Sequence, residues 1–363
     1  MTRYMPILKA REGEFGALEA LPEDIRNTLT PLIEIPKVPH DYVRDRPTKT
    51  LEQHIAGIGD RLRKSWGDRP VYVQLPRHTD GASETLSDGL AAVGGVLQDC
   101  AGLGVRAIPV LVTSNSTPYL TAVRDYSANS DEGVCLRLHV GDFDQGDPDS
   151  PSPKSRIDAL LERVGATHHD SVDVVLDLGD LSQDLNMASM VARTMFGELP
   201  YRTAWRSVAL AAASFPENLS EVVGGTERVI KRHEWALWNR LRRRDEWSQV
   251  VFGDYAIAHS KITELDPRTM RMSASIRYTT DASWLVLKGR NVREHGFDQY
   301  FDLCRRLIDR SEYKGPGFSW GDEFIFKCAQ GLGGPGNATT WRKVGTNHHL
   351  TLVARAIAAA AVV

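Results

Sequence analysis

Short apolar runs that end in polar residues alternate along the chain with longer segments of helical spacing. The positions of Ile55, Ile58, Leu62 and Trp66 place apolar side chains on one face of a helix. Strands separated by helices need crossover connections, and these favour a parallel sheet. Eight apolar runs are predicted as strands: Met5–Leu8, Leu32–Ile35, Val71–Leu75, Ala107–Val112, Val134–Val140, Val172–Leu178, Ser207–Ala213 and Tyr255–Ala258.

The predicted strands are rich in β-branched residues, and several are continuously apolar, which is typical of strands covered on both faces. Eight such strands with intervening helices predict an α/β fold with a TIM-barrel-like (β/α)8 core over residues 1–265. The remaining part, 266–363, is predicted to form a β hairpin, from Ala274–Thr279 and Trp284–Lys288, and helices that pack on the core. This late antiparallel pair leaves one alternative, an open doubly wound sheet with an appended β element.

The composition excludes several classes of protein. Of the 363 residues, 42% are hydrophobic and 25% are charged, and the formal net charge is −3. These values exclude a disordered chain, a collagen-like chain and a protein that coats nucleic acid by bulk charge. The four cysteines form no C-x-x-C pair, which favours reduced thiols in the cytoplasm. The N-terminus lacks the apolar core of a signal peptide and the apolar C-terminus is too short to cross a bilayer, so we expect no membrane association.

Four segments are more distinctive than the rest of the sequence. They are the stretch from Phe318 to Ile357 with its GLGGPGN and NHHL motifs, the opening PILKAREGEFGAL, the LIEIP segment at Leu32–Pro36, and GDY at Gly253–Tyr255. In these segments the chain resembles the phage beta protein family, whose members are phage and bacterial proteins of about this length. The resemblance covers nearly the whole chain. It implies a barrel-like α/β body and a role in phage–host conflict, but it carries over no assigned mechanism.

Polar residues follow the ends of the predicted strands, where a parallel barrel has its active face. They form a mixed ring of cations and carboxylates, which is typical of a site for an anionic substrate. Lys and Arg bind phosphate or carboxylate, while a carboxylate or His transfers a proton. We predict that Glu34, Asp177 and His139 are catalytic. The predicted substrate-binding residues are Lys9, Arg11, Arg77, Arg137, Arg277, Arg342 and His348.

Each of the three catalytic candidates has an alternative interpretation. Glu34 interrupts an apolar run, so it either forms a buried ion pair with Lys9 or contacts substrate. Asp177, Glu34 and His139 are suitable ligands for Mg²⁺ or Mn²⁺, but nothing in their spacing requires a metal and we predict none. Asp180 either joins the site or is the N-cap of the next helix. His139 points to the same side as the preceding arginine on its strand, although a lone strand histidine is commonly a core residue.

Two further segments carry binding candidates. The glycine-rich turn at Gly331–Asn337, with Arg342 and His348, forms either an anion pocket or a turn that leads into a helix over His349–Ala360. The segment Arg228–Trp247 combines arginines with tryptophans. It is either a nucleic-acid surface, on which the indoles stack with bases, or an amphipathic helix whose apolar face packs on the sheet.

These features predict an enzyme that acts on a phosphate-bearing or nucleotide-like anionic substrate. The alternative is a non-catalytic module that binds protein or nucleic acid in phage exclusion or defence. The sequence identifies no cofactor, so the cofactor is unknown at this point.

Overall fold

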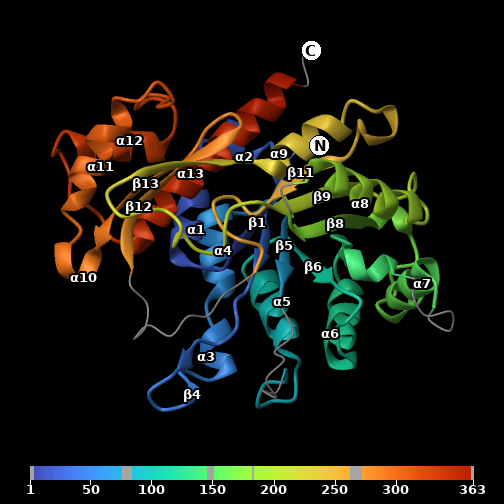
Figure 1. Cartoon of the computed structure of the whole chain (residues 1–363). Helices are drawn as coiled ribbons and strands as arrows, with labels where there is room; N and C mark the ends of the chain where they lie inside the picture. The colour runs from blue at the N-terminus through green and yellow to red at the C-terminus, as the bar shows by residue number, and fades with distance from the viewer. Residues whose placement is uncertain (1–3, 76–83, 145–150, 182–183, 262–271, 361–363) are drawn as a thin grey trace.

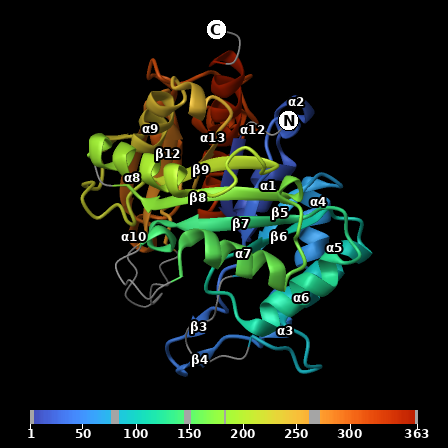
Figure 2. The ribbon, with the colours of Figure 1, turned by 90° about the vertical axis from the view of Figure 1, so that its right-hand side faces the viewer.

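Eight parallel strands close into a barrel in the computed structural model, which describes residues 4–75, 84–144, 151–181, 184–261 and 272–360. Each strand pairs with its neighbours in chain order, and the last strand pairs with the first. Figure 2 shows three of them, β7, β8 and β9, side by side in the barrel wall. The strands are β1 (Tyr4–Lys9), β2 (Leu32–Glu34), β5 (Val71–Gln74), β6 (Ala107–Leu111), β7 (Val134–His139), β8 (Val172–Asp180), β9 (Ser207–Ala213) and β11 (Val251–Asp254). This confirms the TIM-barrel-like fold and excludes the open sheet.

Helices cover the outside of the barrel, and apolar side chains fill its inside (Figure 1). Inward-facing residues such as Met5, Tyr72 and Val175 form a separate apolar cluster within the barrel, so it is a packed core and not a pore. The covering helices are α1 (Glu12–Glu19), α2 (Glu23–Arg26), α3 (Leu51–Ile55), α4 (Ile58–Trp66), α5 (Ala92–Gly102), α6 (Thr117–Ser127), α7 (Pro153–Arg163), α8 (Leu185–Glu198) and α9 (His233–Leu241). The short elements are β3 (His40–Asp41), β4 (Arg46–Pro47), η1 (Val140–Phe143), η2 (His169–Ser171) and η3 (Asp245–Trp247).

The eighth strand lies four residues earlier than the apolar pattern predicts. The strand β11 ends at Asp254, and the predicted Tyr255–Ala258 run is the loop that follows it. The strand ends here because Ala256 has a positive φ of 51°, which no strand residue adopts. Gly253 also conceals the strand in the sequence, although packing requires it: a Cβ there would lie 3.0 Å from the Cβ of Ala211.

The C-terminal part contains the predicted hairpin, formed by β12 (Ser273–Thr279) and β13 (Ser283–Asn291). A third strand, β10 (Glu227–Lys231), pairs with β13 on its other side. The prediction of a continuous helix over Arg228–Trp247 was therefore wrong at its beginning, because these residues extend the C-terminal sheet before α9 starts. The helices of this part, on the left in Figure 1, are α10 (Val292–His295), α11 (Gln299–Ile308), α12 (Trp320–Ala329) and α13 (Ala338–Ala360).

Helix α13 joins the two parts of the molecule. It begins at Ala338, well before the predicted start at His349. Its first half contributes Trp341 and Val344 to the apolar cluster of the C-terminal part, and its second half contributes Leu350 and Val353 to the cluster around the barrel. The division into 1–265 and 266–363 stays a prediction. Within the described residues, no helix is long and apolar enough to span a membrane.

Candidate active site at the carboxyl end of the barrel

Polar side chains from several strands meet at the carboxyl end of the barrel. The register of the sheet explains the meeting, because Lys9 pairs with Glu34, and Glu34 pairs with Gln74, on neighbouring strands. On the opposite wall, Asp177 pairs with His139. Each of these residues lies at or near the last position of its strand, which is where parallel barrels carry their chemistry.

Arg137 lies at the centre of this group and connects its two walls. Its Nη1 donates to Glu34 Oε1 at 2.6 Å and also to Gln74 Oε1, while its Nε and Nη2 donate to Asp177 Oδ2 at 2.9 and 2.6 Å. Lys9 forms an ion pair with the other oxygen of Glu34. Tyr255 donates to Asp177 Oδ2 at 2.5 Å. We call Lys9, Glu34, Arg137, Asp177 and Tyr255 the mouth network; all five are buried.

Mutual neutralisation keeps the two carboxylates of the mouth network ionised. Burial alone would raise the pKa of Glu34, but the charges of Arg137 and Lys9 outweigh it and lower that pKa. The pKa of Asp177 is also lowered, because burial is outweighed by the charges of Arg137 and His139 and by the Tyr255 hydrogen bond. Burial lowers the pKa of Lys9, against the opposing attraction of Glu34. Two cations and two carboxylates therefore form one closely paired unit.

The position of Arg137 decides between the alternatives for the predicted catalytic carboxylates. Its guanidinium lies between Glu34 and Asp177, where a bound metal ion would have to lie to bridge them. No group of three metal-ligating side chains occurs among the residues that the structure describes. Glu34 forms the buried ion pair with Lys9 that was one of its two interpretations, and both side chains are almost fully covered. Glu34 therefore stabilises the network and has little surface for substrate.

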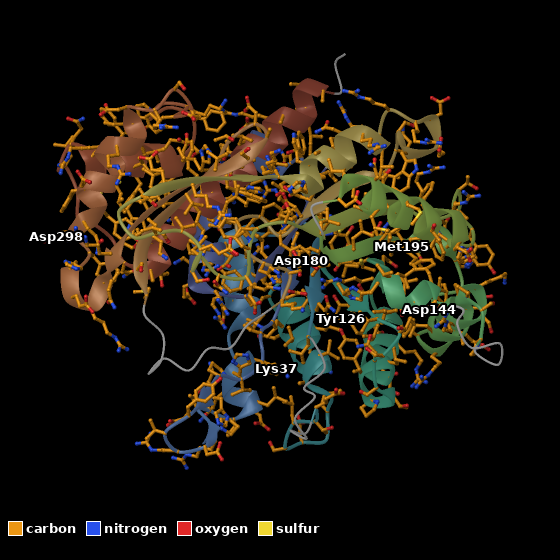
Figure 3. The ribbon with its side chains drawn as sticks, in the orientation of Figure 1. Lys37, Tyr126, Asp144, Asp180, Met195 and Asp298 are labelled. Carbon is orange, nitrogen blue, oxygen red and sulfur yellow. The ribbon has the colours of Figure 1, made fainter. Side chains whose placement is uncertain are left out.

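Two histidines lie beside carboxylates of β8 at the barrel end. The side chain of His139 is 48% exposed, and its Nδ1 lies 3.7 Å from Asp177 Oδ2. His259, in the loop after β11, has its Nε2 3.5 Å from Asp180 Oδ1, and its Nδ1 accepts a hydrogen bond from the Lys261 backbone. Asp180 lies near the centre of the view in Figure 3. It is not a helix cap, because Asp184 caps α8 instead.

The loop after β11 folds over the mouth network. Tyr255, its first residue, reaches Asp177, and the carbonyl of Ser260 accepts from Lys9 Nζ at 3.4 Å. The carbonyl of Ile257 accepts from Arg277 Nη1 at 2.8 Å. Sequence reasoning missed Tyr255 as a site residue because it was assigned to the first position of a predicted strand, Tyr255–Ala258, at the end opposite to the expected site. Tyr255 directly follows Gly253 and Asp254, the last two residues of β11, and this position after a strand end is the signal that would have identified it as a site residue.

Three of the other predicted substrate-binding arginines, Arg11, Arg277 and Arg342, lie at the start of α1, on β12 and on α13. Arg342, on α13, has its Nη1 3.2 Å from Glu14 Oε1 on α1. Arg277, on β12, is partly buried and stacks over the Phe215 ring at 4.7 Å. Arg11 is exposed at the start of α1. Arg77 lies outside the described residues.

His348 does not join the site. It is fully buried between α12 and β12, where its Nδ1 lies 2.8 Å from Asp322 Oδ2 and its Nε2 2.8 Å from the Thr279 carbonyl. Both ring nitrogens are therefore used within the fold. The sequence interpretation placed His348 just before a helix that starts at His349 and made it a ligand contact, whereas it lies inside α13, fully buried and without a surface for ligand.

The tryptophans of the basic segment pack inside the protein. Trp238 and Trp247 are buried, and Trp235 packs edge-on against Phe252. Arg242 lies over the Trp238 ring at 4.8 Å. Indoles in these positions are not available to stack on bases, so the arrangement favours the amphipathic interpretation.

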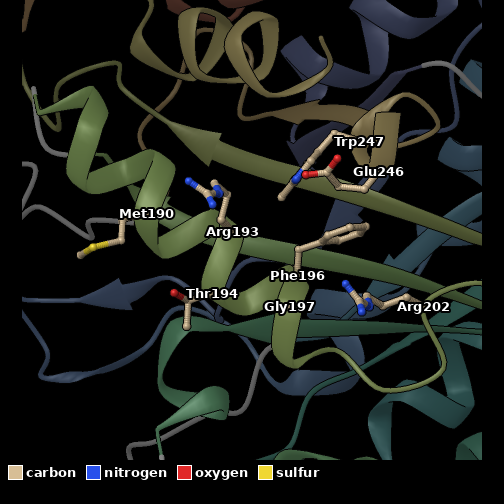
Figure 4. Close-up of a pocket in the computed structure, with 8 residues that line it drawn as sticks. All are labelled: Met190, Arg193, Thr194, Phe196, Gly197, Arg202, Glu246 and Trp247. Atoms are coloured by element: carbon tan, nitrogen blue, oxygen red, sulfur yellow. The ribbon is translucent and has the colours of Figure 1, made fainter. Parts of the chain in front are cut away.

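A surface pocket of about 340 Å³ lies elsewhere on the molecule, beside α8 (Figure 4). Its lining residues come from α8 and from the segments just before β9 and β11, at the amino end of those strands. Two arginines, Arg193 and Arg202, and two aromatic residues, Phe196 and Trp247, are among the residues that line it. Trp247, from the basic segment, lines this pocket, but none of the predicted catalytic or substrate-binding residues does. The pocket lies at the amino end of the barrel strands, whereas parallel barrels carry their active sites at the carboxyl end.

Comparisons with known proteins give one family and several solved structures. A family model described as Beta protein matches residues 4–355. A mutant tryptophan synthase α-subunit from Pyrococcus furiosus is 12% identical with a TM-score of 0.37, and the match covers 70% of this chain and 87% of that one. A type I 3-dehydroquinate dehydratase from Clostridium difficile is 12% identical with a TM-score of 0.37, over 72% and 88% of the two chains. No curated protein matches the chain.

Proposed function

This chain belongs to the Beta protein family, and we propose that it is an enzyme that acts on a small anionic substrate, phosphate-bearing or nucleotide-like, at the carboxyl end of its barrel. The observation that carries the proposal is the pair formed by His139 and Asp177. His139 is half exposed, while the carboxylate beside it is buried and ionised. An exposed imidazole next to a fixed carboxylate is the arrangement that general acid–base catalysis uses.

In this proposal His139 transfers the proton and Asp177 orients it. The carboxylate lies on the Nδ1 side of the ring, which leaves Nε2 for a substrate hydroxyl or leaving group. The separation of 3.7 Å is longer than a hydrogen bond, and catalytic pairs of this kind tighten when ligand binds. Protonated His139 stabilises negative charge on the substrate, and the ionised Asp177 stabilises the imidazolium.

The remaining members of the mouth network are positioning residues in this proposal. Arg137 and Tyr255 hold Asp177 Oδ2 by three hydrogen bonds, so its carboxylate has one orientation toward His139. Glu34 and Lys9 hold Arg137 from the other wall. Glu34 thus supports the chemistry through Arg137 and does not touch the substrate, which changes the role that the sequence suggested for it.

A second candidate is a non-catalytic role in phage exclusion or defence, in which the mouth binds a ligand without turning it over. The guanidinium of Arg137 is hydrogen-bonded within the protein to Asp177, Glu34 and Tyr255. This favours the non-catalytic role, because binding a ligand without turnover requires none of these hydrogen bonds to break. Unchanged plating of phage on cells that express the protein would count against this role. For either role we expect a cytoplasmic protein, since all four cysteines are buried free thiols.

The experiment for the enzyme proposal compares two exposed histidines. Wild type, His139→Gln and the matched control His295→Gln are tested for turnover of a panel of phosphate esters and nucleotides. His295 is 42% exposed and lies 4.0 Å from Glu294, so it resembles His139 without adjoining the mouth. We expect H139Q to lose about 10²–10⁴-fold in turnover at an unchanged melting temperature, and H295Q to match wild type. Full activity in folded H139Q would overturn the proposal.

A further inference from the structure

Positive charge exceeds negative charge where α1, α13 and β12 meet. Arg342 pairs with Glu14, and Arg11 precedes α1 close enough to lower the pKa of Glu14 against the larger effect of burial, which leaves that pKa raised. Arg277 comes from the neighbouring sheet. Glu14 is the one carboxylate, among the described residues, whose charge acts on Arg277. We call Glu14, Arg277 and Arg342 the arginine crevice.

Arg277 is held in this crevice with little compensation for its charge. Among the described residues, the carbonyl of Ile257 is the acceptor for one of its five N–H groups, and Phe215 lies under its guanidinium. Burial, together with repulsion from Arg342, lowers the pKa of Arg277 to about 10. A guanidinium that loses solvation beside another cation destabilises a fold unless something else compensates it. Its partial exposure leaves a path for a ligand from solvent.

The carboxylate of Glu14 also has fewer polar partners than its charge requires. Its side chain is deeply buried, and only Oε1 meets Arg342. Its Oε2 is buried and has no hydrogen-bond partner among the described residues. One incompletely bonded carboxylate therefore faces several arginines, so the charges of this region do not cancel as those of the mouth network do.

We propose that the arginine crevice binds the anionic group of the ligand, a phosphate or another anion with several oxygens, between Arg277 and Arg342. Such an anion accepts hydrogen bonds from two planar guanidinium groups at once, which a carbonyl does not. The inference rests on the proposed function, because it names the group that holds the substrate's anionic end. The loop after β11 links the two places, since Ile257 touches Arg277 while Tyr255 and Ser260 touch the mouth network.

Phosphate binding to the full-length protein tests this inference. Inorganic phosphate and pyrophosphate are titrated calorimetrically into wild type, Arg277→Gln, Arg342→Gln and the control Arg306→Gln. Arg306 is 32% exposed and pairs with Glu227, much as Arg342 is 28% exposed and pairs with Glu14. We expect both crevice variants to bind at least 10-fold more weakly and R306Q to bind as wild type. Arg277→Lys keeps the positive charge but loses the planar guanidinium group. We expect its affinity for phosphate to lie between those of wild type and R277Q.

A fifth variant, Glu14→Gln, is expected to change the phosphate affinity in the opposite direction. Glu14→Gln removes the one competing carboxylate, so we expect it to bind phosphate several-fold more tightly than wild type. Weaker binding in E14Q, or equal binding in wild type, R277Q and R342Q, overturns the inference. These outcomes are independent of His139: loss of turnover in H139Q with phosphate binding unaffected by R277Q would retain the proposed function and reject the crevice.

Discussion

Two buried networks of this protein use the same types of residue in the same order of contact. In the mouth network, Arg137 lies between Glu34 and Asp177, with Tyr255 and His139 on the aspartate. The second network lies between the barrel and α13. There an arginine lies between a glutamate and an aspartate, and a tyrosine and a histidine contact the aspartate; its members are Arg232, Glu234, Asp254, Tyr4 and His349.

The two networks differ in the exposure of the histidine and in the bonding of the arginine, because Arg232 Nη2 lies 3.8 Å from Asp254 Oδ2 and has no hydrogen-bond partner among the described residues. His349 is fully buried, and both ring nitrogens are engaged, by Asp254 at 2.8 Å and by Thr279 at 2.9 Å. Burial lowers its pKa against the attraction of Asp254. His139 contacts its aspartate from the solvent side. The same residue types thus join two parts of the fold in one network, and in the other they include the half-exposed histidine to which we assign proton transfer in the proposed function.

The comparison teaches that residue type and pairing do not identify a site by themselves. Both arginines are buried and paired with carboxylates, and both aspartates have lowered pKa values despite their burial. What distinguishes the mouth network is that it joins side chains from the carboxyl ends of several parallel strands and contacts a half-exposed imidazole. The following predictions test that distinction.

The largest expected effect comes from removing the central arginine of either network. Arg232→Met removes the buried cation beside Glu234 and Asp254, and Arg137→Met removes the one that joins Glu34 to Asp177, which leaves Glu34 with Lys9 alone. We expect each change to lower the free energy of unfolding by about 3–5 kcal/mol, measured by urea denaturation. A loss below about 1 kcal/mol in R232M would mean that the second network does not hold the two parts together.

Replacing the histidine of each network should change the free energy of unfolding by different amounts. His349→Gln removes a buried partner from Asp254 and is expected to cost about 1.5–3 kcal/mol. His139→Gln, at a half-exposed position, is expected to change the unfolding free energy by less than about 0.5 kcal/mol. The same urea titrations measure both. Equal destabilisation by the two changes would remove the contrast between a structural and a functional histidine.

The dependence of stability on pH gives a smaller effect. The pKa of His349 is lowered in the fold, so the unfolded chain binds its proton more readily. Its contribution is complete above the unfolded pKa of about 6.5 and is lost as the pH falls toward the folded value. We expect the melting temperature of wild type to decline in this window and that of H349Q to decline less. His233, whose pKa is also lowered by burial, accounts for a remaining slope.

The ionised carboxylates act in a lower pH window. The folded pKa values of Glu34, Asp177 and Asp254 lie below their unfolded values of about 4. Their contribution is therefore complete above about pH 4 and is lost as the pH falls through the folded values. H349Q and H139Q should each lack part of this acid-side loss, because His349 lowers the pKa of Asp254 and His139 lowers that of Asp177; the part that comes from Glu34 should remain in both. Absence of the acid-side loss in wild type would show that the carboxylates are not stabilised as ions.

Much of the barrel could be predicted from the sequence, because parallel strands buried on both faces leave continuous apolar runs. The strand β11 escaped prediction because Gly253 and Asp254 interrupt its apolar pattern, one to fit against Ala211 and the other to bind His349. The strand β10 escaped because its residues are mostly exposed and continue into a helix without a break in polarity. Both errors come from tertiary contacts that local patterns do not contain.

In the candidate site, too, some features could be predicted from the sequence and others could not. Lys9, Glu34, Arg137 and Asp177 could be named in advance, because strand ends of a parallel barrel converge. The docking of α13 could not be predicted from local spacing. That docking buries His348 and brings Arg342 to Glu14, so two residues of one predicted motif have opposite environments.

The most direct test of the distinction between the two networks is a histidine NMR titration. Protein labelled with ¹³C at histidine is titrated with the phosphate ester or nucleotide that the wild type turns over, and H139Q and H349Q assign the two resonances. We predict that the His139 resonance shifts with ligand, while the His349 resonance stays in place. A His139 resonance that does not respond to a ligand that the protein binds would contradict an active site at the mouth of the barrel.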